Sequence, residues 1–587
     1  MAGMRILRNS IRKLLTERNK LLLLSLVVGI SAGLAAVLLT GAIEYIKNFF
    51  TGAPGEAYYW RFLILPGVGM LISLLLLRFV VRDNIGHGVT KALVAVSRNE
   101  SKIKPHNMWS SLLTSSITIG FGGSVGAEAP IVYTGAAIGS NLGRWAGMSY
   151  RHITILLGCG AAAAVAGIFR APLAGVLFVM EILLFNVSMS TMLPLLIATI
   201  SATVVTYIFR GQASMFQCSI TPFSMGNIPF YVIMGVVMGF CALYFTNSTL
   251  WLEDKIGRLA SRWSRWIVCA VCLGGLIFLF PPLYGEGYDC LQLLLRGAEA
   301  DVESGTLMSF MFSSPWGVPV FFLLVFFLKV IAMTLTNAGG GVGGTFGPTL
   351  FAGAIMGFVI ARFFNLAGAG VPEQNFVLVG MAALMAGVMQ APMTAIFLIA
   401  EISGGYGLLI PLILTSTIAF GTVRIFDHYS IYTKRIAQSG DLLTHDNDQA
   451  VITLLQTRSL VRDKYPRVNV NATLGEFVEM IAGSDAAVVA VLDDEGRFEG
   501  MIDIAHARKY LFRTEQYGSL HVYNMMESAP AYISETEKME SVISKFEKTD
   551  AWRLPVIDSE RRYLGFISKS RILMAYRSEL KELNCEE

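Results

Sequence analysis

One carboxylate, Glu128, lies between glycines and a proline inside an apolar stretch, "GGSVGAEAPIVYTG" at residues 122–135. Glycines let the backbone bend and approach a ligand closely, and Pro130 suits the first turn of a helix, where its missing N–H costs nothing. The stretch therefore predicts a loop that enters a helix N-terminus. Such an end carries unpaired amides and about half a positive charge, and it can hold an anion. A deprotonated Glu128 would compete with that anion and a protonated one would give way, unless Glu128 is a plain N-terminal helix acid.

A second stretch, "GGVGGTFGP" at residues 340–348, has the same design of glycines, an aromatic residue and then Pro348. Two such helix ends that converge near the middle of a membrane could hold an anion without any full positive charge. That matters for flux, because a Lys or Arg would bind the anion too tightly to release it.

The composition indicates a membrane protein. Of the 587 residues 54% are hydrophobic and only 15% are charged, against roughly a quarter charged in soluble proteins. Residues 21–43 contain no charge and are long enough to cross a hydrocarbon core of about 30 Å. A cleaved signal peptide is the alternative for this run, but its apolar core is typically about 7–15 residues long.

Charge and cysteine usage restrict the orientation and the partners. Residues 1–20 are basic, and the positive-inside rule makes them cytoplasmic. The basic residues concerned are Arg5, Arg8, Arg12, Lys13, Arg18 and Lys20. The net charge of +4 is too dispersed to indicate a nucleic-acid partner. The one CxxC, Cys269-Ala-Val-Cys272, lies inside an apolar segment, and no second Cys pair or Cys/His cluster accompanies it. We therefore predict neither a metal site nor a disulfide framework.

The apolar region, residues 21–440, is interrupted and repeated. Its runs are broken by Gly, Pro or single charges, which at membrane depth is tolerated only where backbone faces protein or a water-filled cavity. "GAAAAVAGIFRAPLAGVLFVMEI" from Gly160 aligns without a gap with "GMAALMAGVMQAPMTAIFLIAEI" from Gly380. We therefore predict an all-α polytopic membrane domain of two repeated, inverted halves, about 21–215 and 225–435, with a binding site between them.

Residues 441–587 have the charged, patterned composition of a soluble domain. "AAVVAVLDDEGRFEGMIDI" reads strand, turn, strand, and "WRLPVIDSERRYLGFISKS" repeats the pattern 65 residues later. The sequence predicts two small α/β units, at about 457–513 and 523–578. They are cytosolic if the membrane part ends inside.

These motifs resemble those of the CLC family of chloride channels and proton/chloride exchangers, and the tail resembles the paired cystathionine-β-synthase (CBS) domains common at CLC C-termini. The family's G-[KR]-E-G-P signature corresponds to Gly126-Ala-Glu128-Ala-Pro130. Its G-G-x-F-x-P signature is intact at residues 343–348. Lys329, fourteen residues before Gly343, matches the family's K-x-x-A pattern.

The resemblance implies a set of site residues and an assembly. Glu128 becomes the external gating glutamate, the backbone amides of Thr345 and Phe346 hold chloride, and Tyr432 in "SIYTKRI" donates its hydroxyl to the central anion. The predicted anion-binding set is His87, Gly88, Gly126, Glu128, Gly344, Thr345, Phe346 and Tyr432. The resemblance also implies a homodimer in the cell membrane, with chloride or a related anion, protons and the lipid bilayer as partners. Both termini are expected to be cytoplasmic.

Position 87 departs from the family pattern. The family's G-S-G-I-P loop corresponds to Gly86-His87-Gly88-Val89-Thr90, so His87 replaces the serine that donates to the central anion. An imidazole N–H can also donate, and a protonated ring adds charge. Alternatively His87 points elsewhere and backbone amides suffice. Chloride, nitrate and other small anions therefore all stay open as substrates.

Position 182 departs as well. Many family exchangers have an acidic pair after "APLAGVLF", whose second member receives internal protons, but here the pair reads Glu181-Ile182. Isoleucine carries no proton. Either Glu181 or water serves a proton path, or Glu181 is a structural acid like its repeat partner Glu401. The sequence therefore leaves a passive channel and a proton-coupled exchanger both open.

The tail lacks one nucleotide-binding residue of CBS pairs. The resemblance would place a ribose-binding Asp at the end of G-x-[IV]-[ST]-x-x-D, but these positions are His506 and Arg571. Arg571 either meets a phosphate or is a solvated surface residue. We predict no cofactor, and weak or no nucleotide binding.

Two other classes of function are an intramembrane enzyme and a membrane-tethered sensor. An intramembrane enzyme would need a nucleophile with a base, or metal ligands on facing helices. The chain has no HExxH, and its GxSxG match at residues 122–126 is part of the glycine-rich loop before Glu128 that the anion site already explains. We therefore predict that the chain is not an enzyme. A membrane-tethered CBS sensor without transport is the main alternative, although anchoring alone does not need duplicated broken helices.

Overall fold

The computed structural model describes most of the chain. The described residues are 17–51, 60–83, 85–86, 88–98, 101–183, 189–211, 215–216, 220–259, 261–298, 301–302, 306–438, 455 and 457–584. The chain divides into two compact units, Met1–Leu443 and Thr444–Glu587. They are called here the membrane unit and the tail unit.

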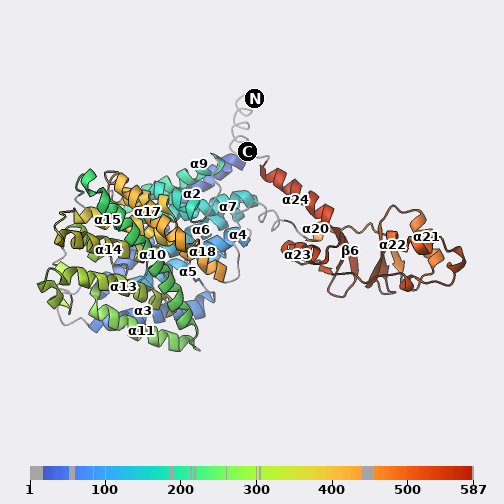
Figure 1. The fold of residues 1–587 in the computed structure, drawn as a ribbon, viewed down its shortest axis with the longest axis horizontal. Helices are drawn as coiled ribbons and strands as arrows, with labels where there is room; N and C mark the ends of the chain where they lie inside the picture. Colours follow the sequence, from blue (N-terminus) through green and yellow to red (C-terminus); the bar gives the residue numbers. More distant parts are fainter. Residues whose placement is uncertain are drawn as a thin grey trace, which may run out of the picture. The chain divides into compact units, whose positions relative to one another are not determined.

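The membrane unit is built of helices (Figure 1). Its α-helices are α2 (Glu17–Thr51), α3 (Trp60–Leu75), α4 (Gly88–Arg98), α5 (Ser110–Gly120), α6 (Glu128–Trp145), α7 (Tyr150–Phe169), α8 (Pro172–Glu181), α9 (Met189–Arg210), α10 (Ile228–Gly257), α11 (Arg262–Leu279), α12 (Tyr288–Leu295), α13 (Gly317–Ala338), α14 (Phe346–Leu366), α15 (Glu373–Met389), α16 (Pro392–Ile402), α17 (Leu409–Phe426) and α18 (Ile431–Gln438). A π-helix, η2 (Leu76–Val81), continues α3. Short 3₁₀ turns are η3 (Pro105–Met108), η4 (Met225–Asn227), η5 (Pro281–Leu283) and η7 (Ser309–Ser313).

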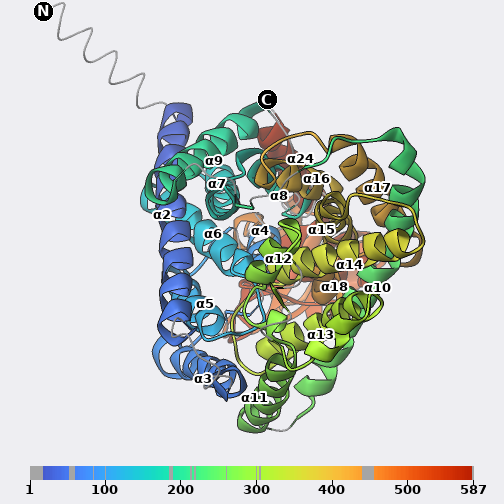
Figure 2. The ribbon, with the colours of Figure 1, turned by 90° about the vertical axis from the view of Figure 1, so that its left-hand side faces the viewer.

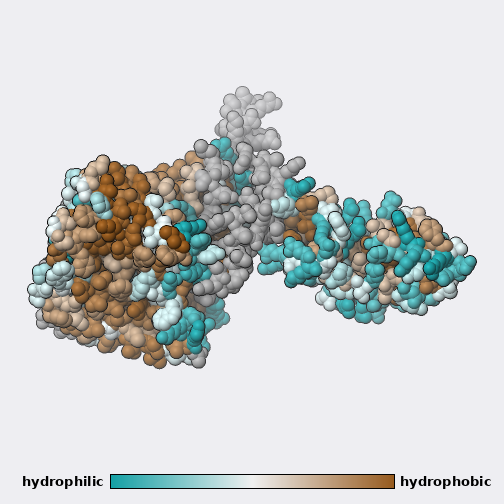
Figure 3. Space-filling view, viewed as in Figure 1, coloured by the Kyte–Doolittle hydropathy of each residue, from teal (hydrophilic) through white to brown (hydrophobic). Residues whose placement is uncertain are grey.

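These helices have the length and composition of membrane spans. Among the described residues, 9 helices are long and apolar enough to cross a membrane, and α8, α15 and α16 are shorter apolar helices. Hydrophobic residues dominate the visible face of the membrane unit in Figure 3, while hydrophilic residues predominate on the tail unit. The predicted all-α polytopic domain with broken helices is confirmed.

The two halves of the membrane unit pack in the same way. Helix α6 packs on α7 as α14 packs on α15, and α2 packs on α9 as α10 packs on α17. Glycines bring the first two pairs close together. A Cβ on Gly135 would lie 2.2 Å from the Gly160 carbonyl oxygen, and one on Gly353 would lie 2.5 Å from the Gly380 carbonyl oxygen. Small residues at such crossings let helix backbones approach in a membrane, so the repeat has a packing reason.

The tail unit holds two copies of one small α/β arrangement. In the first, β1 (Arg467–Asn469) pairs parallel with β2 (Val488–Leu492), and β2 pairs antiparallel with β3 (Phe498–Asp503). The second repeats this order with β4 (Ile533–Ser534), β5 (Arg553–Ile557) and β6 (Tyr563–Ser568). The helices are α20 (Thr457–Leu460), α21 (Leu474–Ala482), α22 (Ile504–Leu511), α23 (Met539–Thr549) and α24 (Lys569–Asn584), with 3₁₀ turns η8 (Thr514–Gln516) and η9 (Val522–Asn524). The predicted α/β tail is confirmed.

The register of the two sheets matches as well. Val491 pairs with Gly500 in the first sheet, and Val556 pairs with Gly565 in the second. A capping box stabilises the start of α21, with Thr473 and Glu476 each bonding the other's backbone amide. The strand–turn–strand repeat recognised in the sequence is thus a repeat in space.

Candidate anion pathway

The two glycine-rich loops pair with each other. The Gly126 amide donates to the Gly344 carbonyl at 3.0 Å, and the Gly344 amide donates to the Gly126 carbonyl at 2.7 Å, which forms an antiparallel bridge. Gly126 precedes α6 and Gly344 precedes α14, so the starts of the two helices are tied together. The convergence of two helix N-termini expected from the sequence is present in the structure.

A second reciprocal pair braces the same loops. The Thr118 hydroxyl of α5 accepts from the Val342 amide at 3.0 Å, and the Thr336 hydroxyl of α13 accepts from the Ser124 amide at 3.1 Å. Each repeat therefore supplies the hydroxyl that holds the other repeat's loop. The loop conformation depends on both halves being present.

The Glu128 carboxylate lies against the first turn of α14. Glu128 begins α6 and is 2% exposed. Its Oε2 accepts from the Gly347 amide at 3.1 Å and its Oε1 accepts from the Tyr288 hydroxyl at 2.6 Å. The sequence suggested a carboxylate at its own helix end. In the structure it instead occupies the N-terminus of the other repeat's helix, where an anion would be held.

Two glycines leave room for this carboxylate. A Cβ on Gly126 would lie 2.1 Å from Oε2 of Glu128, and one on Gly347 would lie 2.9 Å and 3.0 Å from its two carboxylate oxygens. No other residue type fits at either position while Glu128 stays in place. The glycines of the two motifs thus form a cradle around the carboxylate.

The other predicted anion-binding residues lie near this point. Thr345 and Phe346 begin α14, and both are buried. The Tyr432 hydroxyl lies 3.5 Å from Thr345 Oγ1, and Tyr432 is 2% exposed. Gly88 begins α4, where a Cβ would lie 2.4 Å from the Ala129 carbonyl oxygen in the first turn of α6. His87 lies outside the described residues.

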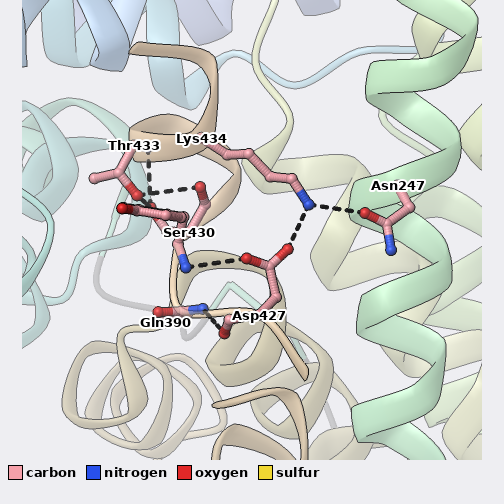
Figure 4. A network of polar contacts seen from close by, with 7 residues as sticks. Asn247, Gln390, Asp427, Ser430, Thr433 and Lys434 are labelled. Carbon is pink, nitrogen blue, oxygen red and sulfur yellow. Dashed lines mark hydrogen bonds and ion pairs between the residues drawn. The ribbon is translucent and has the colours of Figure 1, made fainter. Parts of the chain in front are cut away.

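A polar network around Asp427, shown in Figure 4, holds the short helix α18 to which Tyr432 belongs. Lys434 of α18 donates to both Asp427 and Asn247, the latter at 2.9 Å, which ties α18 to α10. Gln390, just after α15, donates to the Asp427 carbonyl at 3.0 Å. Ser430 accepts from the Thr433 amide at 3.2 Å. Lys434 therefore ties the short helix that presents Tyr432 to α10 and to Asp427, the residue after α17. Gln390 in turn ties Asp427 to the end of α15.

Three further polar residues, which the motifs did not assign to the site, lie around Glu128. Tyr288 of α12 bonds its carboxylate, as given above. Lys329 of α13 is fully buried, and its ammonium donates to Ser124 Oγ at 2.9 Å and to the Gly285 carbonyl at 2.8 Å. Glu286 accepts from the Ala127 amide at 3.0 Å. Figure 2 shows α6, α12 and α14 close together, consistent with their packing.

The sequence of the chain matches a known protein family. Residues 68–424, more than half of the chain, match the family described as "Voltage gated chloride channel". The chain belongs to this family. Residues 522–578 match the CBS domain. The H⁺/Cl⁻ exchange transporter ClcA of Salmonella paratyphi B is 27% identical over 474 residues, covering 76% of this chain and 94% of that protein.

Two solved structures of transport proteins share the fold of this family member. A slow cyanobacterial Cl⁻/H⁺ antiporter superposes with a TM-score of 0.61 at 23% identity, covering 71% of this chain and 97% of that one. A eukaryotic CLC transporter superposes with a TM-score of 0.57 at 16% identity, covering 94% and 97%. These likenesses establish the architecture of the chain.

In this voltage-gated chloride channel family member, Glu181 and Glu401 cap each other's helices. Glu181 ends α8 and accepts from the amides of Met393 and Thr394 at 3.0 and 2.7 Å, in the first turn of α16. Glu401 of α16 accepts from the amides of Leu173 and Ala174 at 3.1 and 2.9 Å, in the first turn of α8. The two helices therefore run antiparallel, as an inverted repeat requires, and Glu181 has a structural task.

The tail unit of the family member places other side chains at the two nucleotide-motif ends. His506 lies 3.2 Å from the Glu527 carboxylate. Asp503, at the motif's Ser/Thr position, caps α22 by accepting from the Ala505 amide at 2.8 Å. The Arg571 backbone amide donates to Ser568 Oγ at 3.3 Å. These contacts occupy the polar groups of the first motif within the protein.

Proposed function

We propose that this chain carries chloride or a similar small anion across a membrane, through a path between its two repeats that Glu128 gates. The observation that supports this most strongly is the Glu128 carboxylate bound to the Gly347 amide, in the first turn of α14. A carboxylate there is a tethered substitute for the transported anion.

The gate works by a change of charge. Deprotonated, Glu128 satisfies the amides and partial positive charge of the α14 N-terminus and excludes an anion. Protonation removes the charge that holds it there, and the side chain can then leave the cradle of Gly126 and Gly347. The anion then takes the place of the carboxylate near the Gly347 amide. From there it passes to the amides of Thr345 and Phe346, with the Tyr432 hydroxyl as a further donor. Binding by dipoles and hydroxyls lets the anion leave again.

Coupling to protons is the finer part of the proposal. The named relatives exchange chloride for protons, and we extend that activity to this chain with Glu128 as the proton-accepting group. A proton route from the inner side must avoid position 182, because isoleucine holds no proton. Glu181 is also an unsuitable carrier, since both of its oxygens accept hydrogen bonds from the first turn of α16.

The remaining properties follow from the family and from charge. We propose a multi-pass protein of the cell membrane with cytoplasmic termini, because residues 1–20 are basic, and a homodimer with one pathway in each subunit. We propose that it acts as a transporter without enzymatic activity or cofactor. The alternative, a membrane-tethered sensor, is tested by deleting residues 441–587, which removes the CBS units. Anion flux that survives this deletion would place the function in the membrane unit.

The direct test uses protein reconstituted into liposomes. Glu128→Gln mimics the protonated carboxyl, so anion flux should persist and lose much of its dependence on pH. A pH response equal to that of the wild type would overturn the gating proposal. With a chloride gradient imposed, uphill proton movement by the wild type would establish exchange, and its absence would leave a passive channel.

A further inference from the structure

A second acid, Glu286, reaches the start of the gating helix from the loop before α12. Its Oε1 accepts from the amide of Ala127, the residue that directly precedes Glu128. Glu286 is half-buried, whereas Glu128 is almost fully buried. A charge on Glu286 therefore lies next to the gate, and it is closer to solvent than the gate is.

The charges around this point are unbalanced. Two carboxylates, Glu128 and Glu286, share the space between α6, α12 and α13 with one fully buried ammonium, Lys329. Lys329 is held by Ser124 and by the carbonyl of Gly285, the neighbour of Glu286. If both acids are ionised the cluster carries one excess negative charge, and one proton shared between them removes it.

The other titratable groups that face the cluster do not change this count. On α12 they are Tyr288, which bonds Glu128, and Cys290 and Asp289; α2 contributes Lys47 and α18 contributes Tyr432. Lys47 forms an ion pair with Asp289, which is largely exposed, so these two charges offset each other. Tyr284, in the same loop as Glu286, donates to the Gly120 carbonyl at 3.4 Å.

We propose that Glu286 sets the pH at which the gate opens, by placing a like charge beside Glu128 that favours the protonated, open form. Like charges in a shared, poorly solvated site cannot both be ionised without cost. Without the Glu286 charge, Lys329 would stabilise the ionised Glu128 unopposed. The gate would then stay closed until a lower pH is reached. This inference rests on the proposed function.

The test is the pH profile of anion flux in liposomes for Glu286→Gln. The glutamine keeps a carbonyl oxygen for the Ala127 amide and removes only the charge. The pH of half-maximal flux should fall by about one unit. Asp254→Asn is the control, because it removes an exposed acid of α10 whose ion pair is with Arg258 and not with a residue of the cluster. Its profile should equal that of the wild type.

Three further variants separate the possible outcomes. Glu286→Asp keeps the charge and should restore the wild-type profile; a shift that persists there would assign the effect to the lost Ala127 contact and overturn the inference. If Glu286→Gln does not fold, Glu286→Ser removes the same charge and should give the same fall. In a Glu128→Gln background, Glu286→Gln should have no further effect.

The failures of the two proposals can be told apart. If Glu128→Gln retains the wild-type pH response, the proposed gate itself fails. If Glu128→Gln flattens the profile while Glu286→Gln behaves like Asp254→Asn, only the role of Glu286 is overturned.

Discussion

Oε2 of Glu128 lies 3.1 Å from the amide nitrogen of Gly347, and the two residues belong to different repeats. The carboxylate of one half is therefore bound by the helix end of the other half. The reciprocal bridge between Gly126 and Gly344 holds the two ends in that relation.

Gly347→Ala should prevent the gate from closing. The new Cβ would lie 2.9–3.0 Å from the carboxylate oxygens, closer than such contacts allow, so Glu128 must leave its cradle. We expect anion flux at high pH to rise towards that of Glu128→Gln. Gly421→Ala is the control, because a Cβ there meets nothing within 4 Å. Flux in Gly347→Ala that stays as low at high pH as in the wild type would contradict the cradle.

Tyr288→Phe should weaken the closed state without removing it. The phenol donates to Glu128 at 2.6 Å, and a hydrogen bond to a charged group contributes about 1.5–3 kcal/mol. We expect flux in the closed pH range to increase about tenfold. Tyr284→Phe removes a nearby hydroxyl that bonds the Gly120 carbonyl instead, and it should leave flux unchanged. Equal effects of the two substitutions would show that the Tyr288 contact is unimportant.

Glu181→Gln and Glu401→Gln should have equal effects on stability and little effect on coupling. Each removes a charge that accepts hydrogen bonds from a helix N-terminus, so each should lower stability by about 1–3 kcal/mol. Thermal unfolding of the purified protein measures this loss. If Glu181→Gln alone abolishes proton movement while Glu401→Gln preserves it, Glu181 is a proton carrier and its structural reading is wrong.

The tail unit should not bind adenine nucleotides tightly. In the first copy the motif end is His506, which faces Glu527, and Asp503 is used to cap α22. In the second copy Arg571 replaces the ribose-binding acid. We expect ATP at millimolar concentration to leave the unfolding temperature of the full-length protein unchanged. A saturable upward shift would contradict this expectation.

Much of the site followed from sequence, because its residues lie in short motifs. The sequence alone shows the glycines around Glu128 and before Pro348. It also shows the repeat that aligns Glu181 with Glu401. Glu286 and Tyr288 could not be found in this way. Their contacts with residues 127 and 128 span 159 and 160 residues, and they arise from how α12 packs, which no local pattern encodes.

The position of the Glu128 side chain could not be predicted from the sequence either. The stretch at residues 122–135 predicted a helix start, but it could not show that the carboxylate crosses to α14. That placement depends on Gly347, a residue of the other repeat. The same limit applies to Glu181, whose role became clear only from its contact with α16.

The central claim is that Glu128 occupies an anion's place at the N-terminus of α14. Anomalous diffraction from bromide-soaked crystals of Glu128→Gln tests this most directly. We predict a bromide peak within hydrogen-bonding distance of the Phe346 and Gly347 amides, at the position that the carboxylate fills in the wild type. Bromide elsewhere in the membrane unit, with none at this helix end, would contradict the account.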